Sequence, residues 1–86
     1  AYMQTNSVGA RLSRARASNG LTQAQLAAVV GVAITTMSRW ETDAMAPSLE
    51  HLEKLSDALS VSIDWLVRGV HVSTVTPADG AGEVRS

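Results

Sequence analysis

With 86 residues, of which 45% are hydrophobic and 17% charged, the chain suffices for one small domain and is globular rather than disordered in composition. The lack of cysteine excludes disulfides and thiolate metal sites, and no apolar run reaches the roughly 20 residues of a membrane span, which predicts an intracellular, cytoplasmic protein. The net charge of −1 is unevenly divided: residues 7–42 hold four arginines and one glutamate, whereas residues 43–83 hold two basic and seven acidic side chains.

Residues 7–18 form the first predicted helix. Val8, Leu12 and Ala15 recur there at the i, i+4, i+7 spacing of a single helix face. The Asn-Gly pair at 19–20 ends the helix, because both residue types tolerate the left-handed conformation found at helix C-termini. The helix therefore turns one apolar side toward the rest of the domain.

Gly31 divides the next stretch, residues 22–41, into two helices rather than one. A glycine inside a helix costs about 1 kcal/mol relative to alanine, whereas directly after a helix it supplies the left-handed residue that ends it. The earlier of the two helices begins with a capping box, in which the Thr22 and Gln25 side chains each bond the other residue's backbone amide.

The second helix of this pair covers residues 33–41. Its inward residues are expected to be Met37 and Trp40, which are spaced i, i+3. Ala33 stands at its start, where Ser, Thr, Asp or Asn would be the usual cap. Two helices joined by a glycine turn predict a helix-turn-helix arrangement.

Two further helices are predicted in the acidic half of the chain. Ser48 caps the first of them, and Ser62 caps a short one that ends at Gly69 and carries Trp65 and Leu66. The longer helix is expected to bury one leucine face, made of Leu49, Leu52, Leu55 and Leu59.

The two ends of the chain have a different character. Residues 1–6 are expected to be flexible, with residues 1–2 a cloning remnant before the natural methionine start. Residues 70–76 alternate apolar and polar side chains in part and predict a short edge strand, followed by a mobile tail over 77–86. The predicted domain is therefore residues 7–69, with a C-terminal extension after it.

Five short helices joined by tight turns predict a compact all-α domain. The chain has two tryptophans and no phenylalanine, so the indoles must supply much of the burial. The predicted core consists of Leu12, Leu21, Leu26, Ala27, Val32, Met37, Trp40, Leu52, Leu55, Leu59, Val61, Trp65 and Leu66.

A family resemblance is carried by two segments, GLTQAQLAAVVGVAITTMSRWE and PSLEHLEKLSDALSVSIDWLVRG. Together they resemble the lambda-repressor/Cro-like (XRE-type) family of bacterial and phage DNA-binding regulators, over roughly residues 7–69. The resemblance implies a five-helix, sequence-specific DNA-binding domain that acts as a homodimer on a palindromic double-stranded site. It further implies a transcriptional regulator, such as a phage, prophage or bacterial repressor.

The helix over residues 33–41 is the expected DNA-reading element, because a helix fits the major groove when its other side is anchored. Its outward residues would be Ile34, Thr35, Ser38 and Arg39. Arg39 can pair in bidentate fashion with guanine, Thr35 can hydrogen-bond a base or meet a thymine methyl, and Ile34 suits a thymine methyl. A single exposed isoleucine is also common on ordinary surfaces.

Four residues are expected to contact DNA phosphates, namely Gln23, Thr36, Thr42 and Arg11. Gln23 matches the glutamine that the family places at the start of its second helix, where the helix N-terminus adds a positive end. Arg11 is the weaker expectation, since helix arginines are more often solvated. The segment TDAMAP at 42–47 departs from the family's basic, glycine-containing loop, so Thr42 and the loop amides remain as donors and affinity from counterion release should be modest.

Two further sets of residues have expected structural roles. Arg16 and Glu41 match a family pair that joins the first helix to the end of the third. An apolar surface beyond the core is expected to form a homodimer about a two-fold axis and consists of Ile63, Val67, Val70 and Val72.

No catalytic set is present: His51 and His71 lack metal-ligand spacing, and no serine lies in a nucleophile-elbow setting. An enzyme, a cofactor, a metal, a membrane and a small-molecule ligand are therefore not expected, and His51 is expected at the surface. The rival interpretation is a protein-interaction or antitoxin-like module on the same fold. The acidic loop, Ile34 and the negative net charge favour it slightly, whereas Arg39 favours DNA, because interaction surfaces more often carry aromatic anchors.

Overall fold

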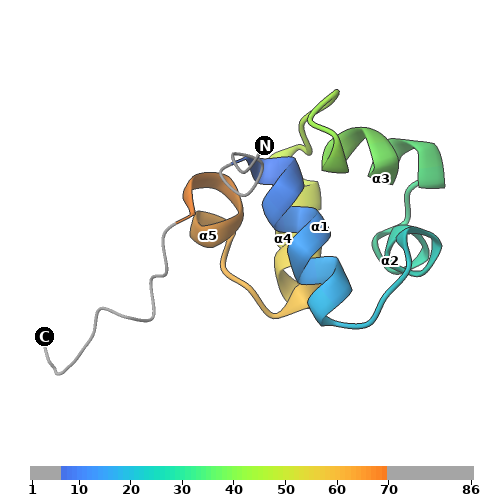
Figure 1. Cartoon of the computed structure of the whole chain (residues 1–86), viewed down its shortest axis with the longest axis horizontal. Coiled ribbons are helices and arrows are strands. Elements are labelled where there is room, and N and C mark those ends of the chain that lie inside the picture. Colours follow the sequence, from blue (N-terminus) through green and yellow to red (C-terminus); the bar gives the residue numbers. More distant parts are fainter. Residues whose placement is uncertain (1–6, 70–86) are drawn as a thin grey trace, which may run out of the picture.

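The computed structural model describes residues 7–69, and over that range it consists of five α-helices without a strand (Figure 1). The helices are α1 (Val8–Ser18), α2 (Gln23–Val30), α3 (Ile34–Glu41), α4 (Leu49–Leu59) and α5 (Ile63–Arg68). The all-α prediction is therefore correct, and the predicted helices are found within a residue or two of their expected bounds. No helix among residues 7–69 is long and apolar enough to cross a membrane.

Side-chain caps explain where most of these helices begin. The hydroxyls of Ser7, Thr22, Ser48 and Ser62 each accept a hydrogen bond from the amide three residues later. Thr22 and Gln25 form the complete predicted capping box. α3 is the exception among the described helices, because Ala33 offers it no side-chain cap.

Gly31 ends α2 in the left-handed conformation, with φ of +80°, and its amide donates to the Ala27 carbonyl at 2.8 Å. A side chain at this φ would be strained, so glycine suits the turn between α2 and α3. The two-helix interpretation of residues 22–41 is confirmed.

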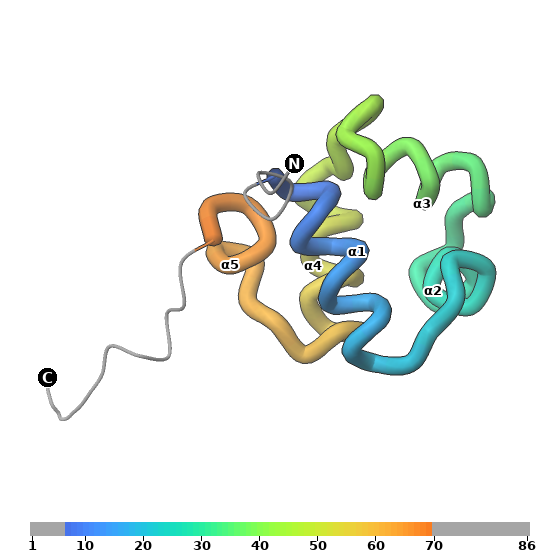
Figure 2. The backbone as a smooth tube through the Cα atoms, in the orientation of Figure 1, coloured from blue at the N-terminus to red at the C-terminus, as the bar shows by residue number. Residues whose placement is uncertain are grey.

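The helices form one bundle with α1 and α4 at its centre, as the backbone trace also shows (Figure 2). α5 lies on one side of this pair and contacts both of its helices. On the other side, α3 contacts α1 and α2, and α2 contacts α4. The helix-turn-helix pair is thus supported from behind by both central helices.

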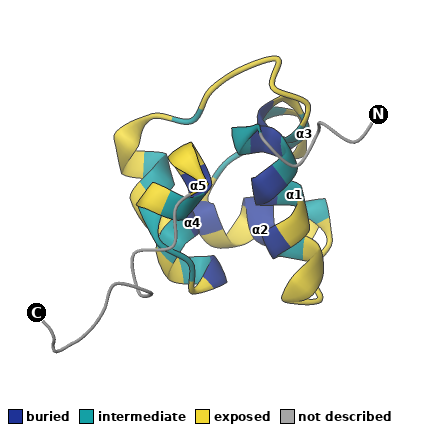
Figure 3. Cartoon of the chain, turned by 60° about the vertical axis from the view of Figure 1, so that its left-hand side comes forward, coloured by how far each residue is buried: buried dark blue, intermediate teal, exposed yellow. Residues whose placement is uncertain are grey.

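Ten apolar side chains are buried in a continuous core (Figure 3). They are Leu12, Ala15, Leu26, Ala27, Val30, Met37, Trp40, Leu55, Leu59 and Leu66. Leu21, Val32, Leu52, Val61 and Trp65, all predicted for the core, pack against it but are only partly buried.

Three details of the predicted packing are corrected. Leu49 is 64% exposed, because at the first residue of α4 it is rotated about 90° from the centre of the leucine face. Val30, absent from the predicted core, is buried in it. His51 is half-buried rather than at the open surface, and its ring lies 5.0 Å from the indole ring of Trp40. The predicted strand, the tail and the residues before 7 lie outside the described residues.

Candidate nucleic-acid interface

α3 is anchored through two buried side chains, Met37 and Trp40. The indole of Trp40 also contacts the ring of His51 on α4, whose Nδ1 lies 2.9 Å from the Ser48 hydroxyl. At about 100° per residue, the side of α3 opposite these anchors carries Thr35, Ser38, Arg39 and Thr42, with Ile34 at its edge. Ile34, Thr35 and Arg39 are exposed there, Ile34 to 52%, and Ser38 is half-buried.

The outward side of α3, from Ile34 to Arg39, has one cation. Over residues 7–69, no carboxylate forms an ion pair with Arg39, and its guanidinium makes no hydrogen bond. A guanidinium whose five donors are uncommitted can bind a planar pair of acceptors. The four residues predicted to contact bases are thus found along one strip of α3.

The two α3 threonines expected at phosphates have different surroundings. Thr36 lies on the flank next to the buried side and is half-buried. Thr42 is exposed, but its hydroxyl donates to the Ser38 carbonyl at 3.1 Å and lies 3.3 Å from the Arg39 carbonyl. The Thr42 hydroxyl therefore closes the end of α3 and would have to rotate to donate elsewhere.

A polar junction of Arg16, Glu41 and Gln23 joins α1, α3 and α2. Arg16 Nε and Nη2 donate to the two carboxylate oxygens of Glu41 at 2.6 and 3.1 Å, in the bidentate ion pair expected for these residues. Gln23 Nε2 donates to Glu41 Oε1 at 3.0 Å, and Arg16 Nη1 donates to the Leu21 carbonyl at 2.8 Å. One carboxylate, itself only 5% exposed, therefore holds three helices together.

Glu41 raises the pKa of the Arg16 guanidinium above its ordinary value. The hydrogen bond is the largest cause and the charge attraction adds to it, while partial burial opposes both. A cation with a raised folded-state pKa stabilises the fold below its unfolded-state pKa and loses that contribution only as pH rises through the folded value. The contribution of Arg16 is therefore complete at neutral pH.

The loop after α3 is bound to the protein rather than open to an anion. The amides of Asp43, Ala44 and Met45 donate back to carbonyls of Trp40 and Arg39, at 2.9 to 3.2 Å. The Asp43 carboxylate accepts from the Gly9 amide in the first turn of α1, at 2.8 Å. These three loop amides are thus not available as phosphate donors, which corrects the expectation from the sequence.

Arg11 has a structural position that its sequence context did not indicate. The residue is 7% exposed, and its Nε and Nη2 donate to the carbonyls of Leu66 and Val67 at 2.9 Å each. A cation at these carbonyls satisfies the C-terminal end of α5 and its negative dipole end. Arg11 is therefore better explained as the link between α1 and α5 than as a phosphate contact.

The face expected to form a dimer is only partly described. Ile63 is half-buried and Val67 is exposed, both on α5, whereas Val70 and Val72 lie outside the described residues. Over residues 7–69, no cluster of three or more His, Asp or Glu side chains could hold a metal ion.

The model of the family described as helix-turn-helix matches residues 12–66, and the chain belongs to this family. The transcriptional repressor RstR of the cryptic phage CTXphi of Vibrio cholerae is 39% identical over 56 residues, 65% of this chain and 50% of RstR. Repressor protein C2 of Salmonella phage P22 is 37% identical over 67 residues, 78% of this chain and 31% of that protein. The chain thus spans about half the length, or less, of these curated relatives.

Solved structures share the fold closely. The crystal structure of the P22 c2 repressor in complex with a synthetic operator has a TM-score of 0.72 and 36% identity, and covers 74% of this chain and 97% of that chain. The crystal structure of SinR, the master regulator for biofilm formation, in complex with DNA has a TM-score of 0.65 and 35% identity, and covers 69% and 95%. This structural class is the lambda-repressor-like one predicted from the sequence.

Proposed function

We propose that this domain binds double-stranded DNA sequence-specifically and reads the major groove with α3, as part of a transcriptional repressor of phage or prophage type. The observation that carries the proposal is the outward strip of α3, on a helix whose other side is anchored by Met37 and Trp40. The guanidinium of Arg39 on this strip forms no ion pair with any of residues 7–69. Such a regulator would work on DNA in the cytoplasm. The relatives named as repressors and the neighbours solved with operator or DNA support this proposal.

The base-reading roles follow from the chemistry of the strip. Arg39 pairs with the O6 and N7 acceptors of a guanine, and Thr35 and Ser38 offer hydroxyls to base edges. Ile34 packs against a thymine methyl, which removes an exposed apolar side chain from water.

The proposed contacts with the DNA phosphates come mainly from the start of α2. The amide of Gln23 has two N–H donors, of which Glu41 engages one, so the second remains for a phosphate oxygen. The positive end of the α2 dipole lies at the same place. Thr36 adds a hydroxyl from the flank of α3, while Thr42 contributes only if its hydroxyl turns away from the Ser38 carbonyl.

A shallow salt dependence follows from this sparse set of cations. Arg11 is buried, Arg16 is paired, and residues 42–47 contain no lysine or arginine. Since each neutralised phosphate adds about −0.9 to the slope of log K against log salt concentration, we expect a slope on the order of −2 to −4 per monomer. Fluorescence anisotropy titrations between 50 and 300 mM salt (roughly the range in which such slopes are linear) measure it; a steeper slope would mean a further phosphate-binding surface.

A homodimer on a palindromic site is the proposed assembly. Val67 is exposed on α5 and Ile63 is half-exposed beside it, and Val70 and Val72 continue the apolar pattern in the sequence. Pairing two such faces about a two-fold axis would set the two copies of α3 about 34 Å apart, one turn of DNA.

The oligomeric state tests this dimer through matched variants. Val67→Glu and Ile63→Glu should lower the sedimentation coefficient at tens of micromolar (about the range of weak domain dimers) and reduce binding to a palindrome. Val29→Glu is the control, because Val29 is exposed on α2, away from the α5 face. A wild-type monomer that binds a palindrome without cooperativity contradicts the dimer.

The protein-interaction module is not favoured. The acidic loop over residues 42–47 was one argument for such a module, but its carboxylate has a role within the fold, because Asp43 accepts a hydrogen bond from the Gly9 amide. The strip on α3 lacks an aromatic anchor of the kind found at the centre of protein interfaces.

A selection from random DNA duplexes tests the proposed function. We expect recovery of a palindrome with half-sites about one helical turn apart, bound at least a thousandfold more tightly than random duplex. Recovery of no preferred sequence, with the same affinity for all duplexes, would contradict sequence-specific binding.

A further inference from the structure

We propose that Asp43 is a positioning residue for DNA binding, because its carboxylate fixes the end of α3 against the first turn of α1. This inference rests on the proposed function of α3 as the DNA-reading helix. It concerns a residue that would touch no base and no phosphate. Its effect would pass through the orientation of the strip that carries Arg39.

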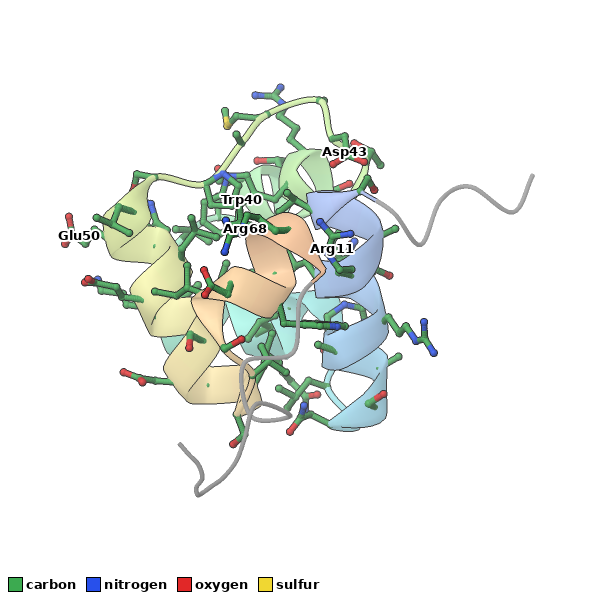
Figure 4. The ribbon with its side chains drawn as sticks, turned by 90° about the vertical axis from the view of Figure 1, so that its left-hand side faces the viewer. Arg11, Trp40, Asp43, Glu50 and Arg68 are labelled. Carbon is green, nitrogen blue, oxygen red and sulfur yellow. The ribbon has the colours of Figure 1, made fainter. Side chains whose placement is uncertain are left out.

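The contact between Asp43 and Gly9 joins two elements 34 positions apart in the chain. Gly9 N donates to Asp43 Oδ1 at 2.8 Å, and Figure 4 shows Asp43 beside the beginning of α1. A Cβ atom on Gly9 would lie 2.5 Å from the Trp40 carbonyl oxygen and 2.6 Å from that of Glu41. The first turn of α1 and the last turn of α3 thus approach so closely that a side chain at position 9 would clash with the carbonyls of α3.

Asp43 occupies a backbone conformation that is unfavourable for most side chains. Its φ is +66°, in the left-handed region that glycine adopts without strain and that aspartate tolerates better than most residues. A glycine would therefore satisfy the backbone alone. The carboxylate adds what glycine cannot, an acceptor for an amide at the start of α1.

The charge of Asp43 is compensated by α1. The first turn of α1 contains no acidic residue of its own, and the local cap, Ser7, binds the amide of Ala10. Asp43 supplies the negative group at this positive helix end from the other side of the domain. The carboxylate is consequently directed at the start of α1, although Asp43 is an exposed residue in the loop after the proposed DNA-reading helix.

The position of Arg39 depends on the same turn. The Arg39 carbonyl accepts from the amides of Ala44 and Met45, and the Trp40 carbonyl accepts from the amide of Asp43. Holding Asp43 against Gly9 therefore fixes the turn after α3, whose amides bind the carbonyls of Arg39 and Trp40. A guanidinium placed about 1 Å away from its position loses bidentate geometry with a base, whereas contacts with mobile phosphates are less demanding.

Three variants separate positioning from stability. Asp43→Gly removes the carboxylate and relaxes the backbone, and Asp43→Asn keeps the Oδ1 acceptor and tolerates the left-handed φ. Asn19→Ala is the matched control, because Asn19 donates to the carbonyls of Ala15 and Leu59 at the opposite end of α1. Amide hydrogen exchange at Gly9 reports the loss of the contact in the free domain.

The experiment measures the affinity of each variant for the duplex selected by the wild type and for random duplex. Asp43→Gly should lose about tenfold on the selected duplex and nothing on random duplex, with faster exchange at Gly9, while Asp43→Asn retains most of the affinity. Equal affinity of Asp43→Gly and wild type for the selected duplex, or an equal loss in Asn19→Ala, would overturn the inference. A wild type that does not distinguish the two duplexes would instead overturn the proposed function.

Discussion

The two ends of α3 are held in different ways. Its beginning has no side-chain cap, since Ala33 supplies none, and the next two residues, Ile34 and Thr35, are exposed. Its end is fixed by the buried indole of Trp40, by the Glu41 carboxylate that binds Arg16, and by the turn that Asp43 closes.

A short helix can thus be oriented although its two ends are held differently. An eight-residue helix has little stability of its own, so its orientation must come from tertiary contacts. Here those contacts come from Met37 in the middle of the helix and from Trp40, Glu41 and Asp43 at its end. The side chains of Ile34 and Thr35 at its beginning are exposed. Substitutions in the last turn of α3 should therefore lower the free energy of unfolding strongly. Substitutions of Ile34 and Thr35 at its beginning should change it little.

The largest effect is expected for Trp40→Ala. Trp40 is buried and anchors the last turn of α3, so its loss should lower the free energy of unfolding by about 3–5 kcal/mol. Trp65→Ala is the comparison within the same chain, and because Trp65 is only partly buried the loss should be smaller than for Trp40→Ala. Urea denaturation measures both losses of stability. Equal losses would contradict the role of Trp40 as the main anchor of α3.

The next largest loss of stability is expected at the polar junction of Arg16, Glu41 and Gln23. Glu41→Ala leaves the guanidinium of Arg16 without its carboxylate and the Gln23 amide without its acceptor, which should cost about 3 kcal/mol. Adding Arg16→Ala to Glu41→Ala should restore part of that loss, because no unpaired charge then remains. A double variant that loses the sum of both single losses in urea denaturation would argue against a coupled pair.

The smallest expected effect is a gain in stability from a substitution at the beginning of α3. Ala33→Ser supplies the missing cap, and its hydroxyl should accept from the amide of Thr36, which adds about 1 kcal/mol to stability. Thermal denaturation detects such a change as a rise in Tm. An unchanged Tm would show that the beginning of α3 already has its amides satisfied.

Local signals made most of the fold predictable. A helix cap involves residues only three positions apart, and the turn at Gly31 depends on that one glycine. The caps at Ser48 and Ser62 and the capping box at Thr22 could therefore be identified from sequence spacing alone. The outward strip of α3 followed in the same way once Met37 and Trp40 were taken as the buried side.

Contacts between distant segments were not predictable by these means. Arg11 meets carbonyls 55 and 56 positions away, and Gly9 meets Asp43 across 34 positions, so neither contact has a periodic signal. The Arg16–Glu41 pair also joins separate segments, 25 positions apart, but was found through family resemblance. Gly9 carried a weaker hint, because a glycine in the first turn of a helix is unfavourable unless another backbone must approach closely.

Recognition of a guanine by Arg39 is the point on which the proposed function most depends. Each guanine of the selected duplex can be replaced singly by 7-deazaguanine, which lacks the N7 acceptor, and titrated with wild type and with Arg39→Ala. We expect one guanine per half-site at which the replacement costs the wild type about 1–3 kcal/mol of binding free energy and costs Arg39→Ala almost nothing. Losses that are the same in both proteins at every guanine would contradict base reading by Arg39.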